Sequence, residues 1–271
     1  MHGDWRLLIT PATHGAWNMA VDEAILEHVG RNEAFPTLRL YAWEPACLSL
    51  GHAQPYADVD VNGLREQGWE MVRRPTGGRA ILHTDELTYS VIASTSEPAV
   101  SGTLLESYSR LAQGLLHAAR LLGLPAEIKA GTHTNVEASN PVCFEAPSAY
   151  EITVGGRKLI GSAQARRKES VLQHGSLPLV GDLTRITGAL ALGSGGARTA
   201  AAARLLARAT TAEAILGRAV SWDEAADAFR IGFEKQLGLQ FARLPLSESE
   251  QQRADELVRE KYAHPSWTER V

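Results

Sequence analysis

The spacing of hydrophobic residues divides the chain into short strands and longer helices. Alternation of apolar and polar positions predicts strands at 5–9, 37–43, 46–50, 69–73, 87–94, 150–154, 158–165 and 171–179. Apolar residues spaced by three and four instead predict helices at 103–122 and 221–238, and the second begins with a helix-capping sequence. Because the predicted strands come in neighbouring pairs, we expect a mostly antiparallel sheet covered by helices.

The clearest of these pairs is the stretch 150–165. Its two alternating segments flank Gly155 and Gly156, and glycine readily adopts the positive φ that a tight hairpin turn needs. Lys158 then begins the returning strand.

A second pair surrounds Pro45. The alternating segments 37–43 and 46–50 are close enough in sequence to form a hairpin, with Cys47 inside its second strand. Free cysteine behaves as a small hydrophobic residue, so we expect Cys47 to be a core thiol.

Polar capping residues predict a helix near each end of the chain. Asn18 is a preferred N-cap residue and predicts a helix that continues to His28, with Asp22 and Glu23 near its positive end. Another capping sequence predicts a last helix over 247–262. The alanine-rich and arginine-rich region 183–216 is expected to form two helices separated by the glycines at 193–196.

Composition is that of a globular protein with a full-sized core. Hydrophobic residues make up 44% of the 271 positions and charged residues 21%, and the formal net charge of −4 supplies no cationic field for nucleic acid. Two cysteines and no secretory signal pattern indicate free thiols in the cytoplasm. No apolar run approaches the roughly 20 residues of a membrane span. We therefore expect a cytoplasmic protein that binds neither nucleic acid nor membranes.

One loop combines glycines with arginines. Residues 73–79 read Arg-Arg-Pro-Thr-Gly-Gly-Arg and join two predicted strands. Gly77 and Gly78 let backbone amides approach a ligand, and the arginines can bind a phosphate or carboxylate with paired donors. A solvated β-turn has the same composition. The role of His83, just beyond the loop, is equally undecided, because most isolated histidines are surface groups or hydrogen-bonded core residues.

Two further positions stand out by their surroundings. Cys143 lies between Pro141 and Pro147, where missing amide donors favour a loop, and loops on rigid sheets often carry chemistry. Within the predicted strand 171–179, His174 is followed by Gly175. A glycine inside a strand indicates a bulge or a ligand pressed against the backbone.

Three segments together resemble the lipoate and biotin protein ligase family. They are Asn-Met-Ala-Val-Asp-Glu at 18–23, Arg-Arg-Pro-Thr-Gly-Gly-Arg-Ala-Ile-Leu-His at 73–83 and Gly-Arg-Lys-Leu-Ile-Gly-Ser-Ala-Gln at 156–164. The chain is most similar to the cysteine-dependent octanoyltransferases that load the glycine cleavage H protein. These share Cys-Phe-x-Ala-Pro-Ser, here at 143–148, and Leu-Gln-His-Gly-Ser, here at 172–176. The agreement of several independent motifs in order and spacing makes the resemblance specific.

The resemblance implies an α+β fold. Its mostly antiparallel mixed sheet with packed helices would be like that of the biotin and lipoate protein ligase catalytic domain, which is similar to the class II aminoacyl-tRNA synthetases. That catalytic domain would span residues 1–245, up to Pro245, and a C-terminal helix and tail would span 246–271.

The implied function is octanoyl transfer. An octanoyl group would pass from octanoyl-acyl carrier protein, through a thioester, to the lysine of a lipoyl-domain protein, the glycine cleavage H protein above all. Neither a cofactor nor a metal is implied.

The same resemblance assigns roles to residues. Cys143 would be the nucleophile, and Lys158 would stabilise its thiolate and transfer protons; a nearby ammonium favours a thiolate on electrostatic grounds. The remaining matched positions would bind substrate, and these are Arg73, Arg74, Gly77, Gly78, His83, Gly161, Ser162, Ala163, His174 and Gly175.

Two other functions compete with octanoyl transfer. ATP-dependent ligases of the family carry a third glycine at the position of Arg79 and need no cysteine nucleophile, whereas a large side chain there would obstruct the nucleotide. A non-catalytic acyl-binding module would keep an apolar tunnel without a working nucleophile. The presence of both Cys143 and Lys158 favours the transferase.

Overall fold

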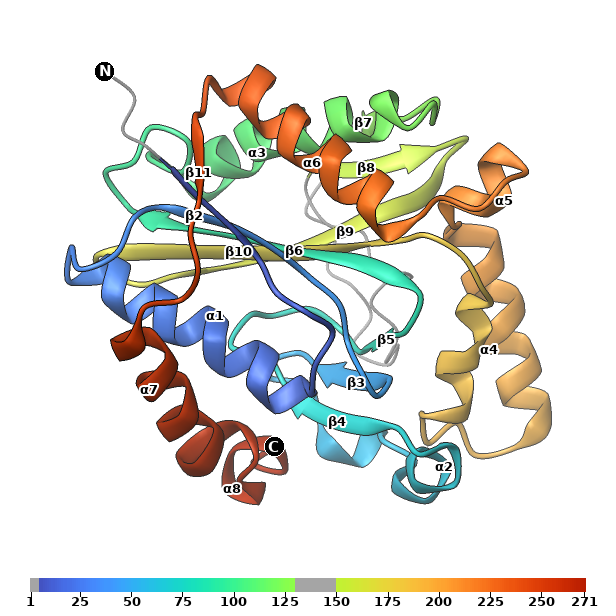
Figure 1. The fold of residues 1–271 in the computed structure, drawn as a ribbon. Helices are drawn as coiled ribbons and strands as arrows, with labels where there is room; N and C mark the ends of the chain where they lie inside the picture. Colours follow the sequence, from blue (N-terminus) through green and yellow to red (C-terminus); the bar gives the residue numbers. More distant parts are fainter. Residues whose placement is uncertain (1–4, 130–149) are drawn as a thin grey trace.

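A mixed sheet runs through the middle of the molecule (Figure 1). The computed structural model describes residues 5–129 and 150–271, and within them this sheet has eight strands. Their order is β11 (Phe241–Arg243), β1 (Trp5–Ile9), β2 (Thr37–Tyr41), β6 (Glu86–Ser94), β10 (Ser170–Pro178), β9 (Arg157–Arg166), β8 (Glu151–Val154) and β7 (Glu127–Lys129). Strand β1 is parallel to both of its neighbours, and the other pairs are antiparallel. The expected mostly antiparallel mixed sheet is confirmed.

A second sheet of three strands lies beside the first. It consists of β4 (Glu70–Arg73), β3 (Cys47–Leu50) and β5 (Ile81–His83), with β3 parallel to β4 and antiparallel to β5. The predicted hairpin around Pro45 is therefore wrong, because β2 and β3 belong to different sheets. Alternation identifies a strand but not its partner. Strand β5 was not predicted, since three residues are too few to show a period.

Helices cover both faces of the large sheet (Figure 1). On one face lie α3 (Leu104–Leu121) and α6 (Trp222–Leu237), and on the other lie α1 (Gly15–Gly30) and α7 (Glu248–Leu257). The region 183–216 forms a 3₁₀ helix η3 (Leu183–Gly188), then α4 (Gly195–Arg208) and α5 (Ala212–Leu216). Shorter elements complete the fold, namely η1 (Tyr56–Asp58), α2 (Val61–Gln67), a π-helical turn η4 (Val258–Tyr262) and α8 (Pro265–Thr268).

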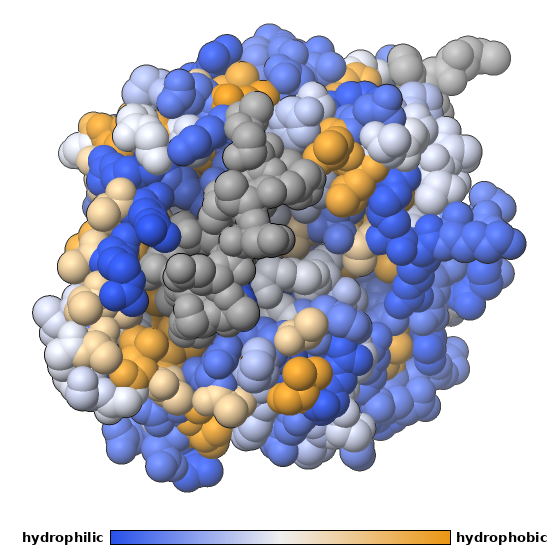
Figure 2. All heavy atoms as spheres, turned by 180° about the vertical axis from the view of Figure 1, so that it is seen from behind, coloured by the Kyte–Doolittle hydropathy of each residue, from blue (hydrophilic) through white to orange (hydrophobic). Residues whose placement is uncertain are grey.

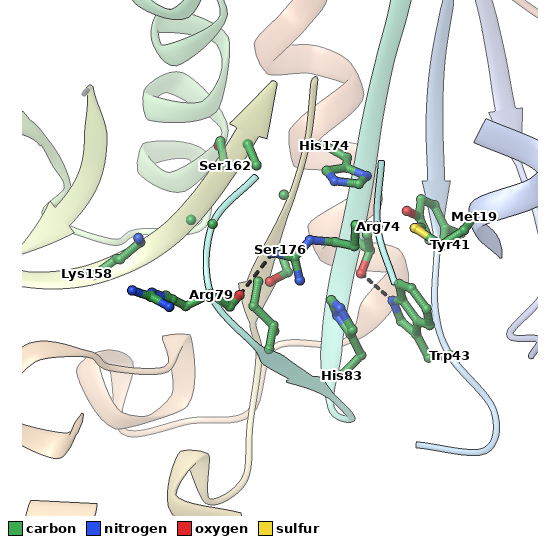
Figure 3. A pocket seen from close by; sticks show the side chains of 16 residues that line it. Met19, Tyr41, Trp43, Arg74, Arg79, His83, Lys158, Ser162, His174 and Ser176 are labelled. Carbon is green, nitrogen blue, oxygen red and sulfur yellow. Dashed lines mark hydrogen bonds between the residues drawn. The ribbon is translucent and has the colours of Figure 1, made fainter. Parts of the chain in front are cut away.

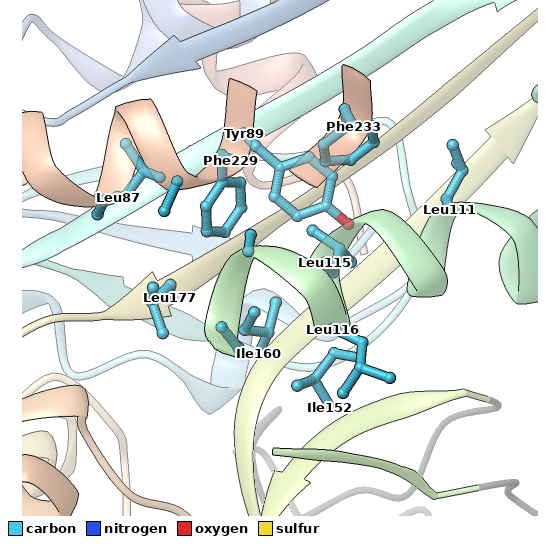
Figure 4. Close-up of a cluster of buried hydrophobic side chains, with 14 of the residues drawn as sticks. Leu87, Tyr89, Leu111, Leu115, Leu116, Ile152, Ile160, Leu177, Phe229 and Phe233 are labelled. Carbon is cyan, nitrogen blue, oxygen red and sulfur yellow. The ribbon is translucent and has the colours of Figure 1, made fainter. Parts of the chain in front are cut away.

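The hydrophobic stripes of α3 and α6 meet the large sheet in one core (Figure 4). Tyr89 of β6 lies with its ring centroid 5.8 Å from that of Phe229 and 6.2 Å from that of Phe233. Glycines allow the two helices to approach closely, because a Cβ on Gly232 would lie 2.6 Å from the carbonyl oxygen of Gly114. Both predicted stripes are thereby confirmed as core-facing.

Helix α1 begins earlier than predicted. Its N-cap is His14, and Asn18 lies one turn inside, where its buried side chain donates to the carbonyls of Thr13 and Ala42. Asp22 and Glu23 are likewise buried in the middle of the helix, not at its positive end. Capping residues and buried polar residues are the same residue types, so only tertiary contacts distinguish them.

The C-terminal segment 246–271 packs against the rest of the chain. Glu250 of α7 accepts two hydrogen bonds from buried Arg6 of β1, at 2.6 and 2.7 Å. Lys261 pairs with Glu23 of α1 at 2.6 Å, and the indole of Trp267 donates to the carbonyl of Arg73. The boundary at residue 245 stays a prediction.

Exposed hydrophobic residues are scattered over the surface. Figure 2 shows small orange groups among hydrophilic residues on the face opposite to that of Figure 1. Single exposed apolar residues are normal on globular proteins. Within the described residues, every helix is too short or too polar to cross a membrane.

Candidate functional site

A cavity of about 290 Å³ lies where the large sheet, the small sheet and α1 meet (Figure 3). Lys158 and Arg79 lie on one side of it in this view, and Met19, Tyr41 and Trp43 on the other. Its lining comes from six stretches of the chain, and consists of Met19, Tyr41, Trp43, Arg74, Gly78, Arg79, Ile81, His83, Thr88, Lys158, Gly161, Ser162, Ala163, His174, Gly175 and Ser176. Nine of the predicted site residues are thus brought together.

The predicted hairpin that carries Lys158 is confirmed. Strands β8 and β9 are antiparallel and joined through Gly155 and Gly156, which have φ of +55° and +76°. The Lys158 side chain is only 5% exposed, and its Nζ lies 2.6 Å from Oε1 of Glu151 on the paired strand. A buried ammonium is stable only with such a partner. The backbone carbonyl of Lys158 also accepts a hydrogen bond from the amide of Thr210, which follows α4.

Arg74 shapes the glycine-rich loop from inside. Its guanidinium donates to the carbonyl and the hydroxyl of Ser49, at 2.7 and 2.6 Å, and to the carbonyls of Gly77 and Arg79, at 3.2 and 3.0 Å. Gly78 lines the cavity with a φ of +95°, a backbone conformation that residues other than glycine rarely adopt. Arg74 therefore fixes the backbone of the loop beside the cavity, and its predicted role in binding an anion stays a prediction.

Arg73 and Gly77 lie outside the cavity lining. Arg73 is buried, and its guanidinium donates to the backbone carbonyls of Gly51, Gln54 and Thr268, at 2.6 to 2.9 Å. It connects the loop after β3 to the C-terminal segment. Gly77 is exposed, and a Cβ added to it would meet nothing within 4 Å. The structure therefore offers no support for substrate binding by these two residues.

His83 is held by a buried polar network. Its Nδ1 lies 2.6 Å from Oε1 of Glu86 and its Nε2 2.6 Å from the hydroxyl of Ser49. The ring stacks on that of Trp43, with centroids 4.0 Å apart and an angle of 10° between the planes. The indole of Trp43 in turn donates to Thr88. His83 and Trp43 thus form one rigid wall of the cavity.

His174 faces the cavity from β10 and has a polar partner on each ring nitrogen. Its Nε2 lies 2.7 Å from the hydroxyl of Thr76, and its Nδ1 lies 3.5 Å from Oδ2 of Asp22. Burial lowers the pKa of His174 below its ordinary value, and the positive charge of nearby Arg74 adds to this, although Asp22 opposes both.

Asp22 contacts His174 from the middle of α1, whereas the sequence predicts it near the positive end of this helix. Burial favours its neutral form, but Arg39, at 2.8 Å, together with hydrogen bonds from His174 and Ser90 holds the pKa of Asp22 below its ordinary value. The family motif at 18–23 includes Asp22. It does not indicate which residues contact Asp22 in the folded protein.

Gly175 is required by close packing. Strand β10 keeps a continuous register with β6 and β9 through this residue, so the predicted alternative of a bulge is wrong. A Cβ on Gly175 would lie 2.1 Å from the carbonyl oxygen of Gly161 and 2.9 Å from the ring of Tyr89. The strand can therefore lie against β9 only without a side chain here.

Of the two cysteines, Cys47 lies within the described residues and Cys143 does not. Cys47 is fully buried, as predicted, and burial followed by the negative charges of Glu70 and Glu86 raises its pKa well above the ordinary value. A buried, protonated thiol is a poor nucleophile. Cys143 lies outside the described residues, so its role stays a prediction.

The described part of the chain holds no group of three or more histidine, cysteine or acidic side chains suited to a metal ion. The cavity surface is mostly apolar, but two buried cations, Arg74 and Lys158, and two buried histidines also line it. Such a site suits an apolar ligand that carries a polar group.

Comparison with known proteins identifies the family. Residues 14–234 match the model of the lipoyl protein ligase A/B catalytic domain. The chain belongs to this family. Octanoyltransferase LipM of Symbiobacterium thermophilum is 42% identical to this family member over 275 residues, with 100% of each chain covered. Octanoyltransferase LipM of Carboxydothermus hydrogenoformans is 40% identical, with 97% of each chain covered.

Solved structures of the family share the fold. Lipoate-protein ligase A bound with ATP is 25% identical, with a TM-score of 0.80 over 98% of this chain and 99% of that chain. A bi-partite lipoate protein ligase from Thermoplasma acidophilum is 24% identical, with a TM-score of 0.81 over 99% and 97%. The predictions of this family, its α+β fold and an acyltransferase activity are confirmed.

Proposed function

We propose that this chain transfers an octanoyl group from octanoyl-acyl carrier protein, through a thioester on Cys143, to a lysine of a lipoyl-domain protein. The observation that carries the proposal is the buried Lys158, which lines an apolar cavity and is held by Glu151. The full-length relatives named octanoyltransferase support the transferred group.

The first step forms the acyl-enzyme. The Cys143 thiolate attacks the carbonyl carbon of the carrier thioester, and the carrier leaves as its free thiol after taking a proton from the ammonium of Lys158, which becomes neutral. The ammonium of Lys158 favours the thiolate electrostatically. Cys143 lies eight positions before Glu151, a length of chain that spans up to roughly 28 Å when extended, so the thiol is within reach of the cavity.

The second step releases the product. The neutral amine of the acceptor lysine attacks the thioester, Cys143 leaves as a thiolate, and the attacking nitrogen loses a proton as the amide forms. Lys158 in its neutral form accepts that proton.

The acceptor is a lipoyl domain, and the glycine cleavage H protein is the one we expect to be preferred. The Thermoplasma acidophilum ligase that shares this fold is described together with its E2 lipoyl domain. We also propose a cytoplasmic location, because the reducing cytosol keeps a nucleophilic thiol in its free form.

Arg79 favours the transferase over an ATP-dependent ligase. Ligases of the family are expected to carry glycine at this position. Here the Arg79 side chain lines the same cavity as Lys158 (Figure 3). A side chain of this size occupies space that an acyl-adenylate would need.

Intact-mass measurement tests the proposal directly. The purified chain is incubated with octanoyl-acyl carrier protein, with and without ATP, and a lipoyl-domain acceptor is then added. We expect one octanoyl adduct on the enzyme without ATP, removal of this adduct by neutral hydroxylamine, and its transfer to the acceptor lysine. Turnover only with ATP would establish the ligase, and no adduct and no transfer would leave an acyl-binding module.

Two variants locate the thioester. Cys143→Ser is expected to abolish the adduct, because a serine hydroxyl is far less acidic than a thiol. Cys47→Ala is the matched control, since Cys47 is buried and lies outside the cavity lining. Loss of the adduct in the control alone would refute the assignment of the nucleophile.

A further inference from the structure

The glycine-rich loop is attached to the large sheet by one side-chain contact that the proposed mechanism does not use. The hydroxyl of Thr76 lies 2.7 Å from Nε2 of His174, and 98 positions separate the two residues in the chain. Both are buried, at 1% and 4% exposure. Because Thr76 is outside the cavity lining while Gly78 and His174 are within it, the contact acts on the cavity through the loop.

The direction of this hydrogen bond follows from Asp22. Its carboxylate is kept ionised by Arg39 and Ser90 and lies 3.5 Å from Nδ1 of His174. A carboxylate accepts but does not donate, so the proton of the neutral imidazole sits on Nδ1. Nε2 is then the acceptor, and the hydroxyl of Thr76 is the donor.

We propose that Asp22 and His174 are positioning residues that hold residues 75–79 against the cavity through the hydroxyl of Thr76. The loop packs closely on the segment after β3, because a Cβ on Gly51 would lie 1.9 Å from the carbonyl oxygen of Gly78. Its other attachments are Arg74, which fixes the carbonyls of Gly77 and Arg79, and the backbone amide of His52, which donates to the carbonyl of Thr76 at 2.8 Å. These attachments leave the Thr76 hydroxyl as the link to the large sheet. The role in catalysis rests on the proposed function, whereas the position of the loop does not.

Protonation of His174 would reverse this hydrogen bond. In the imidazolium both ring nitrogens donate, and the hydroxyl of Thr76 can accept as well as donate. The ionisable groups that face the ring are Asp22 of α1, Arg74 of the loop and His83 of β5. Arg74 is positively charged and the ring is buried, so the neutral form, in which Nε2 accepts, prevails at neutral pH.

Limited proteolysis measures the loop without reference to activity. Arg74 is followed by Pro75, which blocks tryptic cleavage, so the Arg79–Ala80 bond reports opening of the loop. In Thr76→Val, which has nearly the same shape but no donor, we expect cleavage of this bond to be about tenfold faster, as fits the loss of one buried hydrogen bond. Thr76→Ser keeps the hydroxyl and is expected to retain wild-type protection.

A second variant separates the proposed role from general destabilisation. His174→Gln places an amide near the position of Nε2 that can accept from the hydroxyl of Thr76, so its cleavage rate should stay near that of wild type. The proposal is overturned if Thr76→Val keeps wild-type protection, or if His174→Gln is cleaved as fast as Thr76→Val.

Kinetics then connect the loop to the reaction. In Thr76→Val we expect kcat for octanoyl transfer to fall about tenfold, and in Thr76→Ser to stay within about twofold of wild type. An open loop with normal kcat would overturn the positioning role. If wild-type protein transfers no octanoyl group, the proposed function fails while the proteolysis result still decides the attachment.

Discussion

Gly175→Ala tests how tightly the strands behind the cavity are packed. A Cβ at this position would lie 2.1 Å from the carbonyl oxygen of Gly161, whereas non-bonded Cβ atoms essentially never approach within 3.0 Å of another heavy atom. The obstructing atom belongs to the backbone of β9, and β10 is also held by β6 on its other side. No rotamer change can relieve the contact, so the paired strands themselves must separate.

The expected cost is at the upper end of that for overpacking a core, about 3 kcal/mol. For a chain of this size that corresponds to a fall in Tm of roughly 6–12 °C, which thermal unfolding followed by circular dichroism detects. Gly195→Ala, at the first position of α4, is the matched control, because its Cβ would meet nothing within 4 Å. We expect its free energy of unfolding to stay within about 0.5 kcal/mol of wild type. A fall in Tm below about 2 °C for Gly175→Ala would refute the packing argument.

Three further predictions concern the cavity and the C-terminal segment. Gly78→Val is expected to lower kcat/KM at least about tenfold, equivalent to about 1.4 kcal/mol, because valine tolerates the φ of +95° poorly; normal kinetics in folded protein would contradict this. Lys158→Ala should slow alkylation of Cys143 by iodoacetamide near neutral pH, and an unchanged pH–rate profile would count against contact between the two. Arg6→Leu should destabilise the fold by about 3–5 kcal/mol at pH 7, because it removes the partner of buried Glu250. Burial opposes ionisation of Glu250, but Arg6 holds its pKa below the ordinary value, so the contribution of the pair is present above about pH 4.3 and is lost at lower pH. Urea titrations at pH 7 and pH 3 should therefore show the difference from wild type shrinking on acidification.

Local patterns determined most of the elements. The stripes of α3 and α6, the capping residues Thr103 and Ser221 and the Gly155-Gly156 turn each act over a few residues, and each element formed where its pattern predicts it. Lys158 could be placed at the start of a strand for the same reason, because the adjacent turn sets the register. The matched motifs likewise identified the family, since they record chemistry that the family shares.

Tertiary structure alone decided which polar residues became partners. Asn18, Asp22 and Arg73 have the side chains of a helix cap, a surface acid and an anion-binding residue, yet each is buried and bonded to groups far away in the sequence. The partner of a strand is equally undetermined locally, so β2 and β3 went to different sheets. Buried polar groups must find hydrogen bonds somewhere, but the chain reaches those partners only after the hydrophobic cores have brought distant segments together.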